Sequence, residues 1–427
     1  MRWYQKVIQI FKIKDLRKKI IFVLLILVVF RIAANVPVPG IDSERLRQFF
    51  GANQLFGLLN IFTGGAMSNM SIIMLGLGPY ITATIIMQLL TMIFPQLEAL
   101  YKEEGEAGRH KFNQYARMLT VPLAALQSYG MLTILTRQGI TGSFSITQWI
   151  TSILMITAGA VFLMWLGELI SEKGIGNGVS LLIFAGIVAG VPISIRELAI
   201  TYEPSKIPSY LAFFVLALII TAGVVFITEG RRNIPVSYAK RIRGHRVYGG
   251  VSTYLPLNVN PAGVIPIIFA LSIMLFPGMV ANFLSASSTA WLANAARFIS
   301  NAFQNPWFYG VSYFILVVLF TFFYTAVTFD PKNVANNLQK MGGFIPGIRP
   351  GQSTSSFLYY ILNRVLLFGA VFLGTIAVLP SVVQGATGIT AFGFVIGGTA
   401  LLIVVSVVLE TVRQIKSQLV MRDYEGF

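Results

Sequence analysis

Residues that could support catalysis or bind a metal are scarce in this sequence. The 427-residue chain has no cysteine, and its two histidines, His110 and His245, lie among basic neighbours. There is no His-Glu-x-x-His pair and no Walker loop. The glycines of 174–178 follow no soluble strand, so they predict a helix-breaking elbow and not a nucleotide site. We therefore expect no enzyme activity, no bound metal and no cofactor.

The ionisable residues of the apolar stretches also argue against a coupled transporter of small solutes. Such a transporter usually keeps an acidic residue near the middle of the membrane. Here Glu168, Arg364 and Glu410 fall near one edge of their apolar stretches and Arg31 near the opposite edge, where long side chains can reach the membrane surface. The energy for transport must therefore come from a partner, or the protein is passive.

The composition indicates an integral membrane protein. Hydrophobic residues make up 55% of the chain and charged residues 11%, whereas soluble domains contain about 25% charged residues. We expect no cleavable signal, because the basic, amphipathic segment 1–19 leads into an apolar run without a small-residue cleavage site. Apolar runs long enough to span a bilayer predict ten membrane helices at about 20–36, 74–94, 116–136, 151–170, 179–191, 209–228, 264–283, 308–328, 362–380 and 392–410, of which the fifth is short.

About three quarters of the 32 Lys and Arg residues fall on one side of these predicted helices. By the positive-inside rule this side is the cytoplasm, and it holds both termini, the loops 229–260 and 330–352, and the tail 411–427. Topology alone can explain the charge. The alternative is that part of it docks an acidic partner, for example one that contains RNA.

Three segments between the spans carry local signals of their own. Glycines and prolines in 342–351 predict a shaped hairpin. The stretches 236–238 and 246–248 suggest a short β-ribbon. The segment 54–74 is moderately apolar and is broken by Gly64-Gly65. It can re-enter the membrane where protein or water surrounds it, or it can lie on the outer surface as an amphipathic helix, and its composition favours neither.

Six motifs occur in order along the chain: 78–90 (GPYITATIIMQLL), 104–109 (EGEAGR), 174–178 (GIGNG), 262–266 (AGVIP), 347–351 (GIRPG) and 397–404 (GGTALLIV). Together they closely resemble the SecY family of bacterial protein translocation channels, over nearly the whole length. The resemblance implies an all-α integral membrane protein with ten transmembrane helices in two inverted, pseudo-symmetric halves, 20–191 and 192–410. It also favours the re-entrant segment, which would be a plug at about 57–73.

The resemblance assigns roles to particular residues of this sequence. The expected pore ring consists of Ile81, Ile85, Ile183, Ile187, Ile268 and Ile403. The expected plug includes Phe62, Thr63, Gly64, Gly65, Ala66 and Met67. Candidates for lining a lateral gate between spans 2–3 and 7–8 are Thr82, Thr84, Gln127 and Phe276. The expected docking residues are Arg349 first, followed by Lys240, Arg241 and Arg243. The spacing supports the ring, because residues four apart share one helix face, and a hydrophobic constriction excludes ions by dewetting.

We therefore expect a passive channel that passes unfolded secretory polypeptides across the membrane and releases transmembrane segments sideways into lipid. The resemblance implies SecE-like and SecG-like small membrane subunits, a docked SecA-type motor ATPase or ribosome, and substrates that bear signal sequences. It implies a multi-pass protein of the bacterial cytoplasmic (inner) membrane with both termini in the cytoplasm. The alternative function is a secondary transporter of a small solute.

Overall fold

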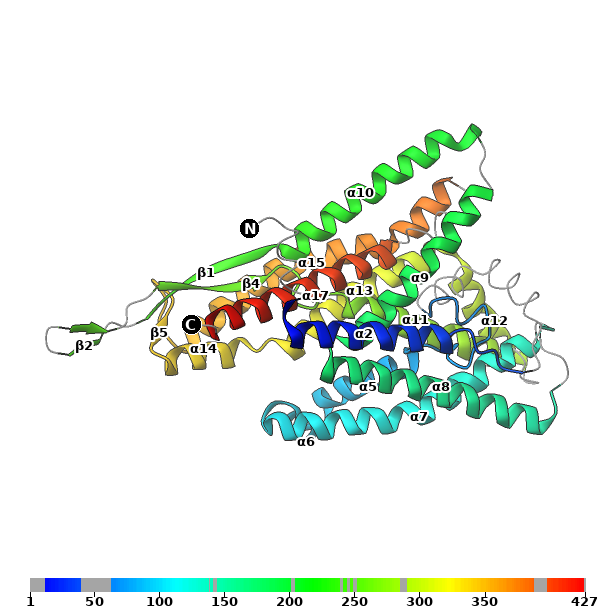
Figure 1. Cartoon of the computed structure of the whole chain (residues 1–427), viewed down its shortest axis with the longest axis horizontal. Helices are drawn as coiled ribbons and strands as arrows, with labels where there is room; N and C mark the ends of the chain where they lie inside the picture. The colour runs from blue at the N-terminus through cyan, green and yellow to red at the C-terminus, as the bar shows by residue number, and fades with distance from the viewer. Residues whose placement is uncertain are drawn as a thin grey trace.

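A bundle of helices, most of them aligned with the long axis of the molecule, forms the body of the protein (Figure 1). This arrangement comes from a computed structural model that describes residues 12–39, 63–137, 139–140, 144–200, 204–238, 241–243, 246–248, 252–284, 290–387 and 398–425. Strands and short helices gather at one end of the bundle, near the end of the last helix, and α12 lies at the opposite end (Figure 1).

Each of the ten predicted spans coincides with one helix. These helices are α2 (Lys14–Ala33), α5 (Gly78–Ile93), α7 (Gly105–Arg137), α8 (Ile146–Lys173), α9 (Gly178–Ile200), α10 (Ile207–Glu229), α11 (Ile265–Leu284), α13 (Pro306–Thr328), α15 (Gln352–Thr387) and α17 (Gly398–Glu425). The start of the tenth predicted span, 392–397, lies outside the described residues. By length and composition alone, five of the described helices could cross a membrane, or six if α5 and the helix after it count as one bent span.

The fifth helix is longer than the sequence predicts. The apolar pattern ends near residue 191, but α9 has 23 residues and continues through Pro192. A proline within a helix removes one backbone hydrogen bond without necessarily ending the helix. The boundary expected between the two halves, at 191/192, therefore falls inside α9. A 3-10 turn, η1 (Pro204–Lys206), precedes α10.

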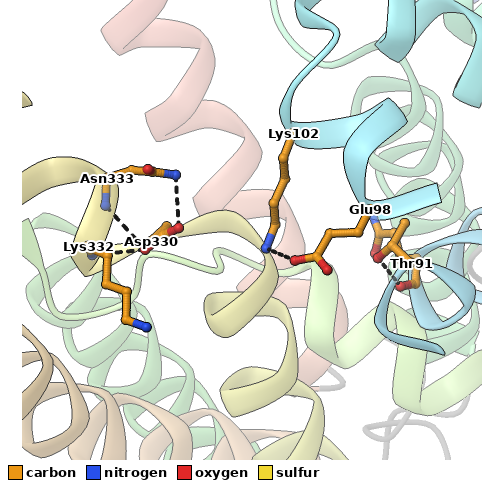
Figure 2. Close-up of polar contacts among 7 residues, drawn as sticks. Thr91, Glu98, Lys102, Asp330, Lys332 and Asn333 are labelled. Atoms are coloured by element: carbon orange, nitrogen blue, oxygen red, sulfur yellow. Dashed lines mark hydrogen bonds and ion pairs between the residues drawn. The ribbon is translucent and has the colours of Figure 1, made fainter. Parts of the chain in front are cut away.

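Three further helices were not among the predicted elements. The first, α6 (Pro95–Lys102), follows α5 at an angle of 111°. The amphipathic α12 (Ala290–Gln304) joins α11 to α13, and α14 (Pro331–Lys340) follows α13. Figure 2 shows the polar contacts of two of them: Lys102 binds Glu98 along α6 at 2.9 Å, and the Asp330 carboxylate accepts hydrogen bonds from the first backbone N–H groups of α14. Such a cap satisfies donors that the helix itself cannot.

Two small sheets lie at the end of the bundle where the chain ends (Figure 1). One has the order β4-β1-β5 and the other pairs β2 with β3. The strands are β1 (Arg231–Tyr238), β2 (Arg241–Arg243), β3 (Arg246–Tyr248), β4 (Ser252–Asn258) and β5 (Gly343–Phe344). The β-ribbon suggested by the sequence exists, but 236–238 and 246–248 do not pair with each other, since Ser237 lies opposite Ser252 and Arg246 opposite Arg243.

The largest apolar core draws on both parts of the chain. It contains residues of α2, α5, α8 and α9 together with residues of α10, α11, α13, α15 and α17. A second core joins α7 and α8 to the segment before α5. The main core therefore includes the contacts between the two expected halves, and a polypeptide could pass between the halves only if these contacts opened.

Candidate functional site

All six isoleucines of the expected pore ring lie in the main core. They come from four helices: Ile81 and Ile85 from α5, Ile183 and Ile187 from α9, Ile268 from α11 and Ile403 from α17. None of the six is more than 9% exposed, and Ile403 is fully buried. Four helices from both parts of the chain thus contribute buried isoleucines to one apolar core, and we call these six residues the isoleucine cluster. Its members carry no group that could bind a particular substrate.

The segment before α5 runs inside the protein. Residues 63–77 form a series of turns and no surface helix, and Thr63, Gly64, Ala66 and Met67 are buried. Ala66 is 0% exposed and belongs to the same apolar core as the isoleucine cluster. The re-entrant interpretation is therefore confirmed over this stretch. The first expected plug residue, Phe62, lies outside the described residues.

The later part of this segment is bonded to the chain that follows α2. The Val38 amide donates to the Met70 carbonyl at 2.8 Å, and the Ile72 amide donates to the Val36 carbonyl at 3.0 Å. Met70 adopts a positive φ of 43°, which is uncommon for a residue other than glycine. Met67, Met70 and Met74 pack against α7 and α8 in the second core. The stretch from Met70 to Met74 is thus held against the N-terminal half.

The candidate gate residues belong to α5, α7 and α11, and α11 packs against both α5 and α7. The Thr82 and Thr84 hydroxyls donate to the carbonyls of Gly78 and Tyr80, four residues earlier in their own helix, each at 2.9 Å. In the part of the chain that the structure describes, the hydrogen bonds of both hydroxyls stay within α5, as is usual for Thr in a helix. Gln127 is half-buried on α7 and faces the start of α5. The side chain of Phe276, in α11, lies outside the described part.

The two long loops that were expected to dock a partner form a single structure. The central strand β1 comes from the loop 229–260, and it pairs with β5 of the loop 330–352 through Ser237–Phe344 and Tyr238–Gly343. The apolar residues beneath this sheet are Ile234, Val236, Leu257, Leu338, Ile345 and Leu358. We call this unit the platform: β1, β4, β5, α14 and the hairpin 345–351. The sequence predicts two separate loops and does not indicate that they pair with each other.

Arg349 stands on the hairpin of this platform with its side chain exposed. The Arg349 carbonyl accepts a hydrogen bond from the Thr354 hydroxyl at 2.9 Å, and the amide of the preceding residue, Ile348, donates to the Ile345 carbonyl at 3.0 Å. Gly347 and Gly351 flank the turn with φ of 83° and 97°, a region that glycine adopts at little cost. The backbone therefore holds Arg349 in place while its side chain stays exposed to a partner. Lys240 and the side chains of Arg241 and Arg243 lie outside the described residues.

Glu168 has a partner that the sequence did not indicate. The Arg117 Nε on α7 donates to the Glu168 Oε1 on α8 at 2.7 Å, with the side chains 39% and 20% exposed. The sequence suggests that the Glu168 carboxylate extends to the membrane surface. In the structure it instead forms an ion pair that connects α7 and α8. No local pattern predicts a contact between residues 51 positions apart.

Replacing Glu168 with Gln should reduce the free energy of the α7–α8 contact by about 1–2 kcal/mol. A hydrogen bond to a charged group stabilises more than a neutral one, and partial exposure to solvent reduces this contribution. We expect the thermal midpoint of the detergent-purified protein to fall. Glu172→Gln changes an exposed acidic residue of the same helix and should leave the midpoint unchanged. Equal midpoints for the two variants would show that the ion pair contributes nothing.

A second long-range contact ties the elbow 174–178 to the last helix. The Gly176 amide donates to the Gln414 Oε1 at 2.7 Å. The preceding residue of α17, Arg413, binds the Glu229 carboxylate at 2.8 Å and donates to the Thr228 carbonyl at 2.8 Å, at the end of α10 just before β1. Arg413 and Gln414 of α17 therefore join the elbow of the N-terminal half to the end of α10, from which β1 of the platform continues. The elbow predicted from the glycines is present, with φ of 88° at Gly176.

Within the described residues, no group of three or more His, Asp or Glu side chains could hold a metal ion. The polar chemistry of the site consists of structural contacts and one exposed basic platform.

Comparisons with known proteins agree with this arrangement. A sequence model of the SecY family matches residues 71–412. The protein translocase subunit SecY of Streptomyces galbus is 45% identical over 434 residues, which cover 98% of each chain. A solved structure described as a protein-conducting channel superposes with a TM-score of 0.64 at 21% identity, covering 93% of this chain and 91% of the other. Sec61 from a canine ribosome–channel complex gives 0.61 at 19% identity, with the same coverage. These two structures confirm the helical membrane-channel fold.

Proposed function

Because this chain belongs to the SecY family of protein translocase subunits, we propose that unfolded secretory polypeptides cross the membrane between its two halves, through the isoleucine cluster. The single observation that carries the proposal is that the six buried isoleucines share one apolar core with Ala66 of the plug. A ring of flexible aliphatic side chains repels ions when empty and can close around a backbone with arbitrary side chains, so it needs no specific binding chemistry.

The protein is a multi-pass protein of the bacterial cell membrane. We place both termini in the cytoplasm on two grounds. The basic loops and tail lie on one side of the predicted spans, as the positive-inside rule requires. In addition, the end of α17 and the platform lie at the same end of the bundle (Figure 1).

The driving force in this proposal comes from a partner, and the chain itself performs no chemical step. A docked SecA-type ATPase or a ribosome would bind the platform, with Arg349 as the principal contact and Lys240, Arg241 and Arg243 next to it. A similar solved channel belongs to a ribosome–channel complex. Guanidinium groups recognise phosphates and carboxylates, which both partners carry. SecE-like and SecG-like subunits would complete the assembly.

Sideways release into lipid would occur at the seam where α11 meets α5 and α7. Interhelical hydrogen bonds in membranes contribute only about 0.6 kcal/mol on average. Thr82 and Thr84 bond within their own helix, so parting the seam would not break these two bonds. A seam held mainly by apolar packing can part for an apolar transmembrane segment and exchange one apolar contact for another.

Reconstitution tests this function directly. The translocase that contains this chain is purified into sealed vesicles and offered a precursor with a signal sequence. We expect the precursor to become protected from protease only when the motor ATPase and ATP are present, and we expect no protection for the same precursor without its signal sequence. Uptake of a small solute without precursor transport would instead support the secondary transporter, which the family relationship does not favour.

A further inference from the structure

Arg31 makes a contact that neither a topological charge nor a helix end requires. It lies in the last turn of α2, where a basic residue favourably meets the helix dipole, and sequence analysis explained it as a side chain reaching for the outer membrane surface. In the structure the Arg31 side chain is half-buried, and its Nη1 donates to the carbonyl of Gly64, a residue of the expected plug, at 2.8 Å. Arg31 therefore points inward, onto the plug.

Gly64 is held between this arginine and α9. A Cβ atom added to Gly64 would lie 2.8 Å from the Gly186 Cα and 3.2 Å from the Arg31 Nη1. Its φ of 67° lies in the region that favours glycine. The two backbones can approach this closely only because both residues lack a side chain. Gly186 lies next to Ile187 in the chain, so this contact sets the plug against a helix that contributes to the isoleucine cluster.

The plug is held to the N-terminal half in two different ways. Residues 70–72 pair with residues 36–38 through two backbone hydrogen bonds, and a Cβ atom at Gly159 of α8 would lie 2.0 Å from the Ile72 carbonyl oxygen. This part is a packed backbone junction. At Gly64 itself, the carbonyl accepts a hydrogen bond from the Arg31 guanidinium. A hydrogen bond from a charged donor is stronger than a neutral one but is a single bond that can break and re-form.

We propose that Arg31 is a latch, a positioning residue that holds the Gly64 region of the plug closed against α9 and sets how readily the channel opens. This inference rests on the proposed function. Movement of the plug breaks the Arg31–Gly64 hydrogen bond and the Gly64–Gly186 contact, while the junction at 70–72 keeps the plug attached to the N-terminal half. The strength of one charge-assisted hydrogen bond then tunes the fraction of time for which the pore is unplugged.

Thiol labelling measures the latch without requiring transport. The chain has no cysteine, so Ala66→Cys introduces its only thiol at a position that is 0% exposed with the plug closed. A membrane-impermeant maleimide, added to the outer face of vesicles that hold the purified translocase, reacts with this thiol only when the plug moves. Adding Arg31→Gln should raise the labelling rate about tenfold or more, the factor that corresponds to losing one hydrogen bond to a charged group.

Three further variants serve as controls for the labelling experiment. Arg31→Lys keeps the charge and one donor, so its labelling rate should lie between those of the wild type and Arg31→Gln. Arg196→Gln removes an exposed arginine of α9 on the same predicted side and should label as the wild type does. Gly64→Ala should open the plug by displacing it from Gly186, and Arg31→Gln should then add little, because both changes break the same contact.

An unchanged labelling rate in Arg31→Gln would overturn the latch, and so would equal acceleration by Arg196→Gln. The outcome is separable from that of the proposed function. If the translocase fails to protect any precursor but Arg31→Gln still accelerates labelling, the latch stands and the transport proposal fails. If precursors are transported normally and labelling does not respond to Arg31, only the latch is lost.

Discussion

Replacing Ile403 with Asn should make the resting channel conduct ions at least about tenfold faster. Ile403 is fully buried and lies in one core with Ile85 and Ile187. An amide buried there without a partner costs about 1–3 kcal/mol, and water entering the constriction relieves that cost. Each 1.4 kcal/mol removed from the barrier to ion passage corresponds to about a tenfold faster flux.

The measurement is potassium efflux from vesicles that contain the purified translocase. The same variant should also transport precursors with defective signal sequences, because a wet constriction needs less energy to open. Ile403→Leu keeps the side chain aliphatic and should stay tight. Val408→Asn places the same amide on an exposed face of α17 and should also stay tight. Wild-type efflux in Ile403→Asn would remove Ile403 from the ring, and equal leaks in both Asn variants would indicate damage to the helix instead of a wetted pore.

The sequence predicts the helices well because their signal is local and repeated. About twenty consecutive apolar residues specify a span wherever they occur, so all ten predicted spans coincide with helices. The six isoleucines were located by their place in family motifs, with i, i+4 spacing as support. Composition alone left the segment 54–74 undecided between re-entry and a surface helix, since burial depends on what surrounds a segment.

The contacts that matter most for mechanism were not predicted, because they join distant residues with no periodic pattern. Arg31 and Gly64 are separated by 33 positions, Arg117 and Glu168 by 51, and Gly176 and Gln414 by 238. The pairing of β5 with β1 brings together strands about a hundred residues apart, and β5 has only two residues. A strand this short leaves no recognisable alternation in the sequence.

Reversing the charge of Arg349 should slow motor-dependent transport at least tenfold while the fold and membrane insertion stay intact. Arg349 is exposed, whereas the hairpin that bears it is fixed by the Thr354 and Ile348 hydrogen bonds and by burial of Ile345. A partner therefore meets an arginine whose backbone is already ordered, and arginine is enriched among the interface residues whose truncation costs about 2 kcal/mol or more. Arg349→Glu replaces this attraction with repulsion toward phosphates or carboxylates.

The charge reversal separates docking from topology because the two explanations depend on different things. If Arg349 only helps to orient the helices, position on the cytoplasmic side is all that matters, and Lys173→Glu, at the exposed end of α8, should impair transport equally. If Arg349 binds the motor, only Arg349→Glu should weaken binding of the ATPase to vesicles, and raising the ATPase concentration should restore part of the transport. Equal defects in the two variants, or normal transport in Arg349→Glu, would contradict the docking role. A rigid hairpin is unnecessary for a topological charge, and the ordering of this backbone around one exposed guanidinium is the reason to expect the first result.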